Sequence, residues 1–525
     1  MRRLRIAVLA AAMALAATAS QANVFRWAAD TDPASMDPYS RRVTATTSFL
    51  SNIYEPLVRR DRNLRLEPSL ATAWRATSPD TWRFELRRNV RFHDGSPFSA
   101  DDVVFSFNRV RGPGSLMAGV LASVKEIRKI DDYTVEFVTT TPDPILPENF
   151  PEWLIMSRRW AEANNAVQTA NLAQNQQTYA SNNANGTGPF RLISRQPDGR
   201  AELEPYAGWW DTPQHNLTRV IFTPLANPAT RAAALLSGEV DMVYTLPLTA
   251  VAQVQSRPNL RVLQTAETRT MFFGMDMVRD ELFDSDVRGR NPFKDIRVRQ
   301  AVRMAIDAEA IRNSVMRGFA VPNYTMAGPG INGFDPALNV PPSRDLDQAR
   351  RLMAEAGYPN GFTMRMDCSN DRYVNDEAIC TAVVAMLARI GIRASLRAIP
   401  FSQYVRLISP PYETNFFYVG WTPSTYDAHN TLLNILVTRA PGSPRGVFNV
   451  GGYSSARLDQ LTDQIQVESN VERRNAMIRE ALTIARDEVG NIPIIQQVIV
   501  WGAKENVELV QPADNYFPLR YVRIR

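Results

Sequence analysis

Residues 82–107, WRFELRRNVRFHDGSPFSADDVVFSF, place a strand-like segment, a turn and the start of a helix in close succession. The strand-like part is 82–86. Ser99 is followed three positions later by Asp102, the spacing of a capping box, and this predicts a helix from there through Val110. We therefore interpret the neighbouring carboxylates of Asp101 and Asp102 as a helix start rather than a catalytic dyad.

Strands and helices alternate through most of the remaining chain. Several predicted helices end at a glycine, namely Gly238, Gly318 or Gly357, as is common at a helix C-terminus. Alternating elements of this kind predict an α/β protein with largely parallel sheets wrapped by helices. The predicted helices are 231–237, 298–317, 345–356, 376–390, 456–466 and 471–489, and the predicted strands are 24–28, 134–138, 241–244, 362–366 and 492–501.

The N-terminus has the organisation of a secretory signal peptide. Three arginines precede a short apolar run, and Ser20-Gln-Ala22 supplies small residues for cleavage after Ala22. No cysteine lies near that site, so we do not expect a lipoprotein. The sequence predicts a protein exported to a bacterial periplasm, with residues 1–22 removed.

Length and composition bound the remaining possibilities. The 525 residues suggest about three domains at ~150 residues each beyond the signal peptide. Without the three signal-peptide arginines, the 59 basic residues fall to 56 against 54 acidic ones. This near-balance, with no dense basic run, argues against a nucleic-acid partner.

Cys368 and Cys380 are the only cysteines, and an even count in an oxidising compartment favours a disulfide. Cys380 lies on the first turns of the predicted helix 376–390, for which Asn375 is the expected N-cap. The bond would join that helix to the strand before Cys368. Two buried free thiols remain the alternative, and a metal pair is disfavoured because no histidine is nearby.

Motifs of common enzymes are absent from the sequence. The three histidines, His93, His215 and His429, are far apart, and no HExxH, CxxC, Walker-type, G-x-G-x-x-G or G-x-S-x-G pattern occurs. Binding without catalysis, metal or cofactor is the better starting hypothesis. A secreted hydrolase with a scattered triad is the alternative from another class.

Several segments in order resemble the family 5 extracytoplasmic solute-binding proteins of dipeptide, oligopeptide and nickel ABC importers. They extend over nearly the whole chain after residue 22, and it is their order that is specific. The matching segments are 53–58 (IYEPLV), 70–74 (LATAW), 82–95, 98–107, 186–190 (GTGPF), 235–241 (LLSGEVD), 295–307 (DIRVRQAVRMAID) and 449–459 (NVGGYSSARLD).

The resemblance implies a two-lobed periplasmic-binding-protein fold (type II, cluster C-like) with an additional third domain. By analogy, lobe I comprises 23–53, 186–277 and 491–525, the extra domain 54–185, and lobe III 278–490. It further implies a monomer that closes on a peptide or peptide-like solute and delivers it to ABC transporter permease subunits. A metal–chelator complex, an opine or another small non-peptide solute is the alternative ligand.

The stretch 420–432, GWTPSTYDAHNTL, matches the loop that contacts solute in this family. In the peptide-binding members, an Asp three residues after the Trp pairs with the peptide ammonium group. Here Trp421 matches, but the third residue on is Ser424. Asp427 could take a cationic group instead, or it could cap its own loop.

Tyr426 and His429 belong to YDAH, which resembles the loop of the nickel-binding member. Trp421 and Tyr426 are the leading candidates for pocket walls, because amphipathic rings bury area at low entropic cost. His429 is a weaker candidate, since a lone histidine is a poor metal site.

Arg372, in the loop between the cysteines, is the candidate partner for a solute carboxylate, because its planar guanidinium suits bidentate capture. The other wall candidates rest on topology, since ligands lie beyond the carboxyl ends of strands in open α/β sheets. They are Asp32, Met36, Tyr244, Phe272, Asn370, Tyr373 and Tyr404.

Overall fold

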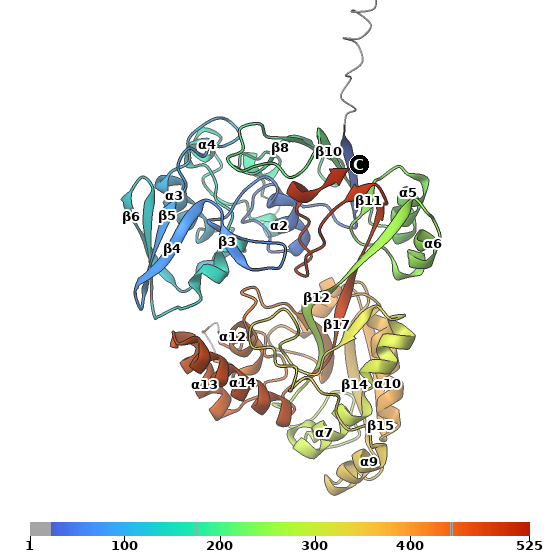
Figure 1. Cartoon of the computed structure of the whole chain (residues 1–525). Coiled ribbons are helices and arrows are strands. Elements are labelled where there is room, and N and C mark those ends of the chain that lie inside the picture. Colours follow the sequence, from blue (N-terminus) through green and yellow to red (C-terminus); the bar gives the residue numbers. More distant parts are fainter. Residues whose placement is uncertain (1–22, 175, 441–442, 444) are drawn as a thin grey trace, which may run out of the picture.

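Two long strands, β12 (Leu260–Met275) and β17 (Ile492–Lys504), run antiparallel through both halves of the molecule (Figure 1). This computed structural model describes residues 23–174, 176–440, 443 and 445–525. The expected signal peptide and its cleavage site therefore lie outside the described residues. We call the half that contains β1 to β11 and the C-terminus the first lobe. The half that contains α7 to α14 is the second lobe.

The first lobe holds a five-stranded arrangement that continues into β17. Its order is β17-β11-β1-β10-β9-β8, with β1 parallel to both β10 and β11. The strands are β1 (Val24–Ala29), β8 (Phe190–Arg195), β9 (Ala201–Pro205), β10 (Arg219–Pro224) and β11 (Met242–Val243). The helices are α2 (Thr44–Leu50), α5 (Pro228–Ser237) and α6 (Val251–Gln255).

A separate antiparallel sheet, β4-β5-β7-β6, lies at the far side of the first lobe (Figure 1). Its strands are β4 (Ala71–Ser78), β5 (Thr81–Leu86), β6 (Val124–Asp131) and β7 (Thr134–Thr139). The helices α3 (Ala100–Val110) and α4 (Arg158–Ala163) lie beside this sheet. The short antiparallel pair β2 (Val58–Arg60) and β3 (Leu66–Pro68) precedes it in the chain. The capping box at the start of α3 is confirmed, because Ser99 N–H donates to Asp102 at 2.9 Å and the Ser99 hydroxyl accepts from Asp101 N–H.

The second lobe continues the long sheet in the order β12-β16-β14-β15. The three strands β14 (Phe362–Ser369), β15 (Ile392–Ile399) and β16 (Phe416–Trp421) are parallel to one another, and β13 (Ala320–Pro322) pairs with β17. The helices are α7 (Ile296–Ala305), α8 (Ala308–Ala310), α9 (Leu346–Glu355), α10 (Asp376–Ala388), α11 (Phe401–Leu407), α12 (Ala428–Thr431), α13 (Ala456–Val467) and α14 (Val471–Asp487). Short strands β18 (Val507–Glu508) and β19 (Arg523–Ile524) pair near the C-terminus in the first lobe.

Two expectations from the sequence were wrong, and a third was confirmed only in the position of the residue. The sheets are mixed rather than largely parallel, because each lobe's parallel strands are flanked by antiparallel ones. The predicted helix 298–317 is broken, since Asp307 caps a new turn by accepting from Ala310 N–H at 3.0 Å. Asn375 is the N-cap residue of α10 as expected, but its side chain makes no capping bond and donates to the carbonyl of Val315 at 2.9 Å.

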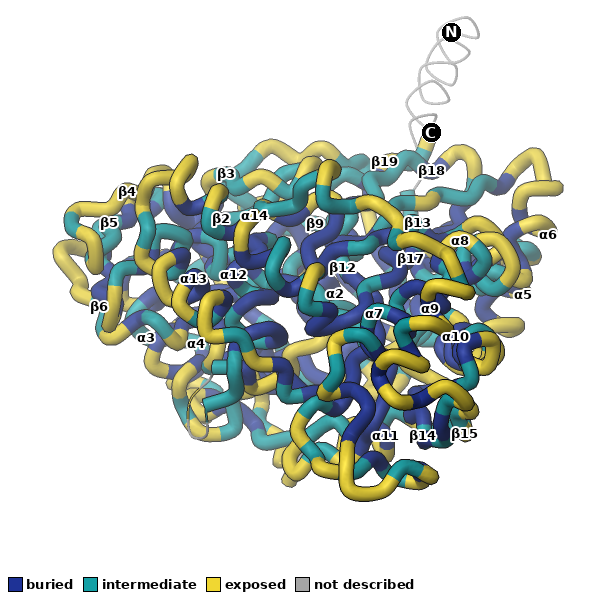
Figure 2. Tube along the Cα trace, turned by 90° about the horizontal axis from the view of Figure 1, so that it is seen from below, coloured by how far each residue is buried: buried dark blue, intermediate teal, exposed yellow. Residues whose placement is uncertain are grey.

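Buried residues form the interior of both lobes, and exposed ones follow the outer loops and helix faces (Figure 2). In the first lobe the core includes packed aromatic rings, and Trp27 meets Phe517 edge to face with 4.7 Å between the ring centroids. In the second lobe the core lies under α7, α10 and α14. Among the described residues, no helix is both long and apolar enough to cross a bilayer.

Candidate functional site

The pairing of β12 with β17 shifts register between Ala266 and Thr270, where the chain passes from one lobe to the other. Residues 267–269, Glu-Thr-Arg, therefore fall outside the ladder. Such a bulge bends a strand locally. Near this point, the buried side chains of Thr268, Gln496 and Gln497 each keep a polar atom that has no hydrogen-bond partner in the described part of the chain. Unmatched polar atoms at a hinge are available to a bound solute or to water.

The first lobe presents the end of β11 to this hinge. Tyr244, the next residue, donates its hydroxyl to the backbone carbonyl of Asn515, and its ring lies 5.3 Å from that of Trp501. Burial raises the pKa of Tyr244, and the nearby carboxylates of Glu267, Asp30 and Asp514 raise it further. Carboxylates from three separate segments therefore act on this tyrosine.

The second lobe presents the ends of β14 and β16. Arg269, at the hinge, donates from Nε to the hydroxyl of Thr422 at 3.0 Å and pairs with Glu267 at 3.2 Å. Trp421 ends β16, donates from Nε1 to Asn430 at 3.1 Å and packs its ring 5.1 Å from that of Phe448. The hinge and the loop after β16 are thus directly linked.

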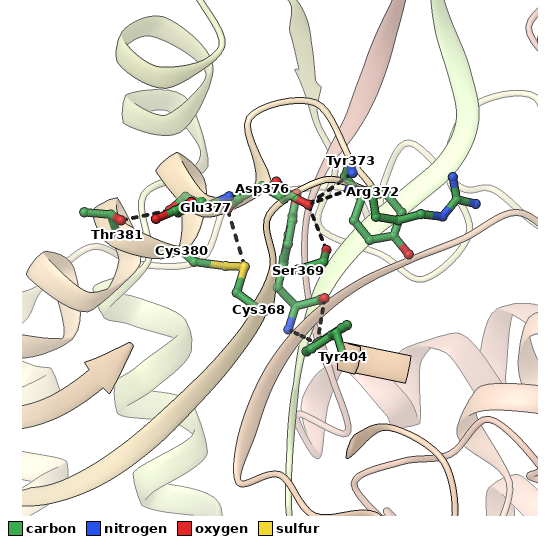
Figure 3. The surroundings of a disulfide bond; sticks show 10 residues. Cys368, Ser369, Arg372, Tyr373, Asp376, Glu377, Cys380, Thr381 and Tyr404 are labelled. Atoms are coloured by element: carbon green, nitrogen blue, oxygen red, sulfur yellow. Dashed lines mark hydrogen bonds between the residues drawn. A yellow bond between two sulfur atoms is a disulfide. The ribbon is translucent and has the colours of Figure 1, made fainter. Parts of the chain in front are cut away.

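The loop after β14 is held at its base by a disulfide between Cys368 and Cys380, which joins β14 to α10 (Figure 3). The carboxylate of Asp376 accepts from the backbone N–H groups of Arg372 and Tyr373, both at 3.2 Å, and from the Ser369 hydroxyl at 2.8 Å. These bonds order a loop that has little regular structure of its own.

Arg372, at the tip of that loop, is exposed, and its guanidinium points away from the disulfide (Figure 3). It lies 5.4 Å from the ring centroids of both Tyr373 and Phe401. Within the described residues it has no carboxylate partner. An unpaired guanidinium on an ordered loop can receive a solute carboxylate by bidentate hydrogen bonding.

The Asp427 carboxylate, unlike the Arg372 guanidinium, is not available to a solute. Both of its carboxylate oxygens accept from Arg474, at 2.6 and 2.8 Å, and Asn332 donates to it at 2.7 Å. It also caps α12 by accepting from His429 N–H at 2.8 Å. Asp427 is buried, so this carboxylate organises the loop from within, which is the capping alternative of the sequence analysis.

A cavity of about 100 Å³ lies where the loop after β16 meets the first lobe. Ser424 and Tyr426 line it from the second lobe, and residues of segments 51–62 and 512–521 line most of the remainder. The Tyr426 ring lies 4.0 Å from the Arg60 guanidinium. The two lobes are therefore in contact through this loop.

The three histidines of the chain are not paired with a nucleophile in the described residues. Burial lowers the pKa of all three histidines to about 4, and no hydrogen bond joins any of them to a serine or cysteine in the described ranges. The same residues contain no group of three or more histidine, cysteine or carboxylate side chains placed to hold a metal.

The family model of the bacterial extracellular solute-binding proteins, family 5 Middle, matches residues 65–442. The chain belongs to this family. It is accordingly a periplasmic solute-binding protein of an ABC importer, a transport receptor and not an enzyme, with a small solute and ABC transporter subunits as its partners.

Similar proteins differ in the solute that they take. The glutathione-binding protein GsiB of Pectobacterium atrosepticum is 25% identical over 449 residues, covering 84% of this chain and 82% of GsiB. The solved structure of DppA from Helicobacter pylori in complex with the peptide STSA gives a TM-score of 0.77 at 25% identity, over 95% of this chain and 98% of DppA. AgaA from A.tumefacien R10 in complex with agropinic acid gives 0.77 at 21% identity, over 96% and 99%.

The site residues predicted from the sequence fall into two groups by their exposure in the structure. Trp421, Ser424, Arg372, Asn370 and Tyr373 are at least partly exposed at the ends of β14 and β16. The remaining candidates are buried or engaged with other side chains, and among them Tyr426 contacts Arg60 and Asp427 binds Arg474.

Four wall candidates are core residues. Met36 and Phe272 are buried among apolar side chains, Tyr404 is fully buried and donates to the Tyr418 carbonyl at 2.9 Å, and Tyr244 is bound to Asn515 as described above. Asp32 pairs with Arg195 at 2.6 Å. His429 is buried, and the fall of its pKa is caused first by desolvation. Position beyond a strand end does not determine whether a side chain points into the core.

Three charged residues near the hinge, Glu267, Arg269 and Asp514, were not among the candidates from the sequence. A signal was present for the first two, because ETR interrupts an otherwise strand-like run from Leu260 to Met275 with two charges. Asp514 lies in an irregular segment, and no pattern in the sequence marks it.

Proposed function

We propose that this receptor binds a short peptide or peptide-like solute between its lobes. Arg372 carries the proposal, because it is an exposed guanidinium with no carboxylate partner in the described part of the chain, on a loop ordered by Asp376 and a disulfide. It would take the solute carboxylate, while Trp421, Tyr373, Asn370 and Ser424 would form the wall on the second-lobe side. The unmatched polar atoms at the hinge would receive backbone-type groups of the solute.

The resemblance of GsiB and DppA supports a peptide-like ligand, since glutathione and STSA are both of this class. Export to the periplasm with cleavage after Ala22 and a monomeric state belong to the same proposal. In it, the lobe that contains Arg372 closes over the solute held against the first lobe. Closure around a solute excludes water and strengthens polar contacts inside the site.

A second candidate is a small non-peptide solute, either an opine or a metal–chelator complex. It is favoured by the loop after β16, because Ser424 is neutral and Asp427 is engaged by Arg474. This loop thus offers no free carboxylate to a peptide ammonium group. AgaA, which was solved with agropinic acid, is a relative of this kind.

Native mass spectrometry of protein purified gently from its own periplasm tests the proposal directly. Denaturing release should give a ladder of short peptides or a single peptide-like mass. A single non-peptide mass, or a metal isotope pattern with a chelator, would replace the proposal by the second candidate.

A further inference from the structure

Tyr426 crosses from the second lobe to the first. Its ring lies 4.0 Å from the guanidinium of Arg60, at the end of β2. Tyr426 and Ser424 are the second-lobe members of the cavity lining, whose other residues come from first-lobe segments 51–62, 151–152, 189, 209 and 512–521. A side chain from one lobe is therefore inserted into a pocket formed by the other.

The insertion is fixed from the second-lobe side. The backbone of Tyr426 is left-handed, with φ of 51°, and its carbonyl accepts from Asn332 N–H at 2.8 Å. The next residue is Asp427, which is held by Arg474 and Asn332. A non-glycine residue persists in this conformation only where its surroundings enforce it. The loop thus presents the tyrosine to the first lobe in one direction.

The pocket is equally ordered from the first-lobe side. Arg60 donates from Nη2 to Glu148 at 2.8 Å and from Nη1 to the Leu64 carbonyl at 2.9 Å, so its planar face is oriented by its own lobe. Asp514 is buried in the lining and accepts from Tyr516 N–H at 2.9 Å. Each of these hydrogen bonds joins two groups of the first lobe.

We propose that Tyr426 and the Arg60 pocket form an interlobe latch that stabilises the closed receptor. A solute site of drug or peptide size needs about 300–1,000 Å³, whereas the cavity beside Tyr426 measures about 100 Å³. In this arrangement of the lobes the space beside Tyr426 is too small for a peptide, so Tyr426 acts on the balance between open and closed states through its contact with Arg60. The latch goes beyond the proposed function, since it is the same whichever solute the receptor carries.

Distance measurements between spin labels on the full mature chain test the latch in the absence of solute. Labels attached through p-acetylphenylalanine at Asn63, in the exposed turn after Arg60, and at Glu472, exposed at the start of α14, report the separation of the lobes and leave the disulfide intact. Co-purified solute is first removed by unfolding and refolding. Because no solute is present, a wrong peptide assignment does not change the result.

The wild type is expected to show a dominant short distance. Tyr426→Ala should lower the closed-to-open ratio by about tenfold, the effect expected for a desolvated cation–π contact. Arg60→Gln, in the other lobe, should lower the closed-to-open ratio by a similar factor. Its loss of the Glu148 ion pair should cost little, because the Glu148 side chain is one-third exposed and can be hydrated. The double variant should open no further than either single variant. Arg60→Gln still tests the latch if Tyr426→Ala does not fold.

Tyr412→Ala is the matched control, because it removes a cation–π contact that lies within the second lobe. The Arg439 guanidinium lies 4.4 Å from the centroid of the Tyr412 ring. This variant should leave the distance distribution unchanged. Distributions for Tyr426→Ala and Arg60→Gln that match wild type, or a wild type dominated by the long distance, would overturn the latch.

Discussion

Asp427 and Arg474 form a bidentate ion pair in the interior of the second lobe, with N–O distances of 2.6 and 2.8 Å and side chains that are 4% and 6% exposed. The pair joins the loop after β16 to α14. It explains why a carboxylate in the solute-contacting loop of the family is unavailable to solute here, because both oxygens already have a cationic partner.

Asp427→Asn is expected to destabilise the protein by about 3–5 kcal/mol, since it leaves Arg474 buried without its counter-charge. Urea unfolding at pH 7 measures the loss. Glu480→Gln is the control, because Glu480 pairs with Arg457 on the exposed surface and should cost less than about 1 kcal/mol. A loss for Asp427→Asn no larger than that of the control would contradict the structural role.

His429 should make stability depend on pH. Burial lowers its pKa to about 4, whereas the unfolded chain titrates near its ordinary value of 6.5. The unfolded state therefore binds more protons between these values, so stability is complete above pH 6.5 and falls as the pH drops toward 4. At pH 5 the loss from this residue is about 2 kcal/mol. His429→Gln should show a smaller drop in unfolding free energy from pH 7 to pH 5 than wild type, and an equal drop would disprove this origin.

Removing the disulfide should loosen the Arg372 loop. The bond closes a loop with a sequence separation of 12, and its loss is expected to cost about 3 kcal/mol in the chain-entropy model. Cys368→Ser with Cys380→Ser, compared with wild type by urea unfolding and by hydrogen exchange of residues 369–376, measures both effects. Unchanged exchange in this segment would show that Asp376 alone orders the loop.

Arg372 should discriminate solutes by their carboxylate. Arg372→Gln is expected to weaken binding of the recovered solute by about tenfold or more, and Arg372→Lys to fall in between, because lysine lacks the bidentate fork. Calorimetry with the solute and its methyl ester provides the comparison. If the substitution weakens binding of the ester as strongly as that of the free acid, Arg372 does not contact the carboxylate.

Trp421→Ala should weaken solute binding by at least about tenfold while leaving the melting temperature of the solute-free protein nearly unchanged. The ring is only partly buried, and its Nε1 bond to Asn430 is local to the loop. A large drop in melting temperature with unaltered affinity would instead identify Trp421 as a core residue.

The structural features that could be predicted from the sequence are mostly those formed by residues close together in the chain. The capping box at Ser99, the glycine that ends α5 and the pairing of Cys368 with Cys380 depend on residues close together in the chain, and all three are confirmed. The family followed from the order of segments, which also made the two-lobed architecture predictable.

The site could be predicted only in part, because its decisive contacts are distant in sequence. Asp427 meets an arginine 47 positions later, and Tyr426 meets Arg60 across the lobes. Neither pairing leaves a local pattern. The strand-end rule gives only the position of a residue in the topology, so it could not show that Tyr404 points into the core.

The strand order has a consequence for how this chain is made. β11 lies between β1, near the start, and β17, near the end, so the sheet of the first lobe is unfinished until residues 492–504 have arrived. In the second lobe, β14, β15 and β16 and the helices α7 to α14 are contiguous in the chain, so they can assemble before the first part of β17 adds to β12 and β13. We therefore expect the first lobe, which starts the chain, to complete its folding last, after synthesis and export of almost the whole polypeptide.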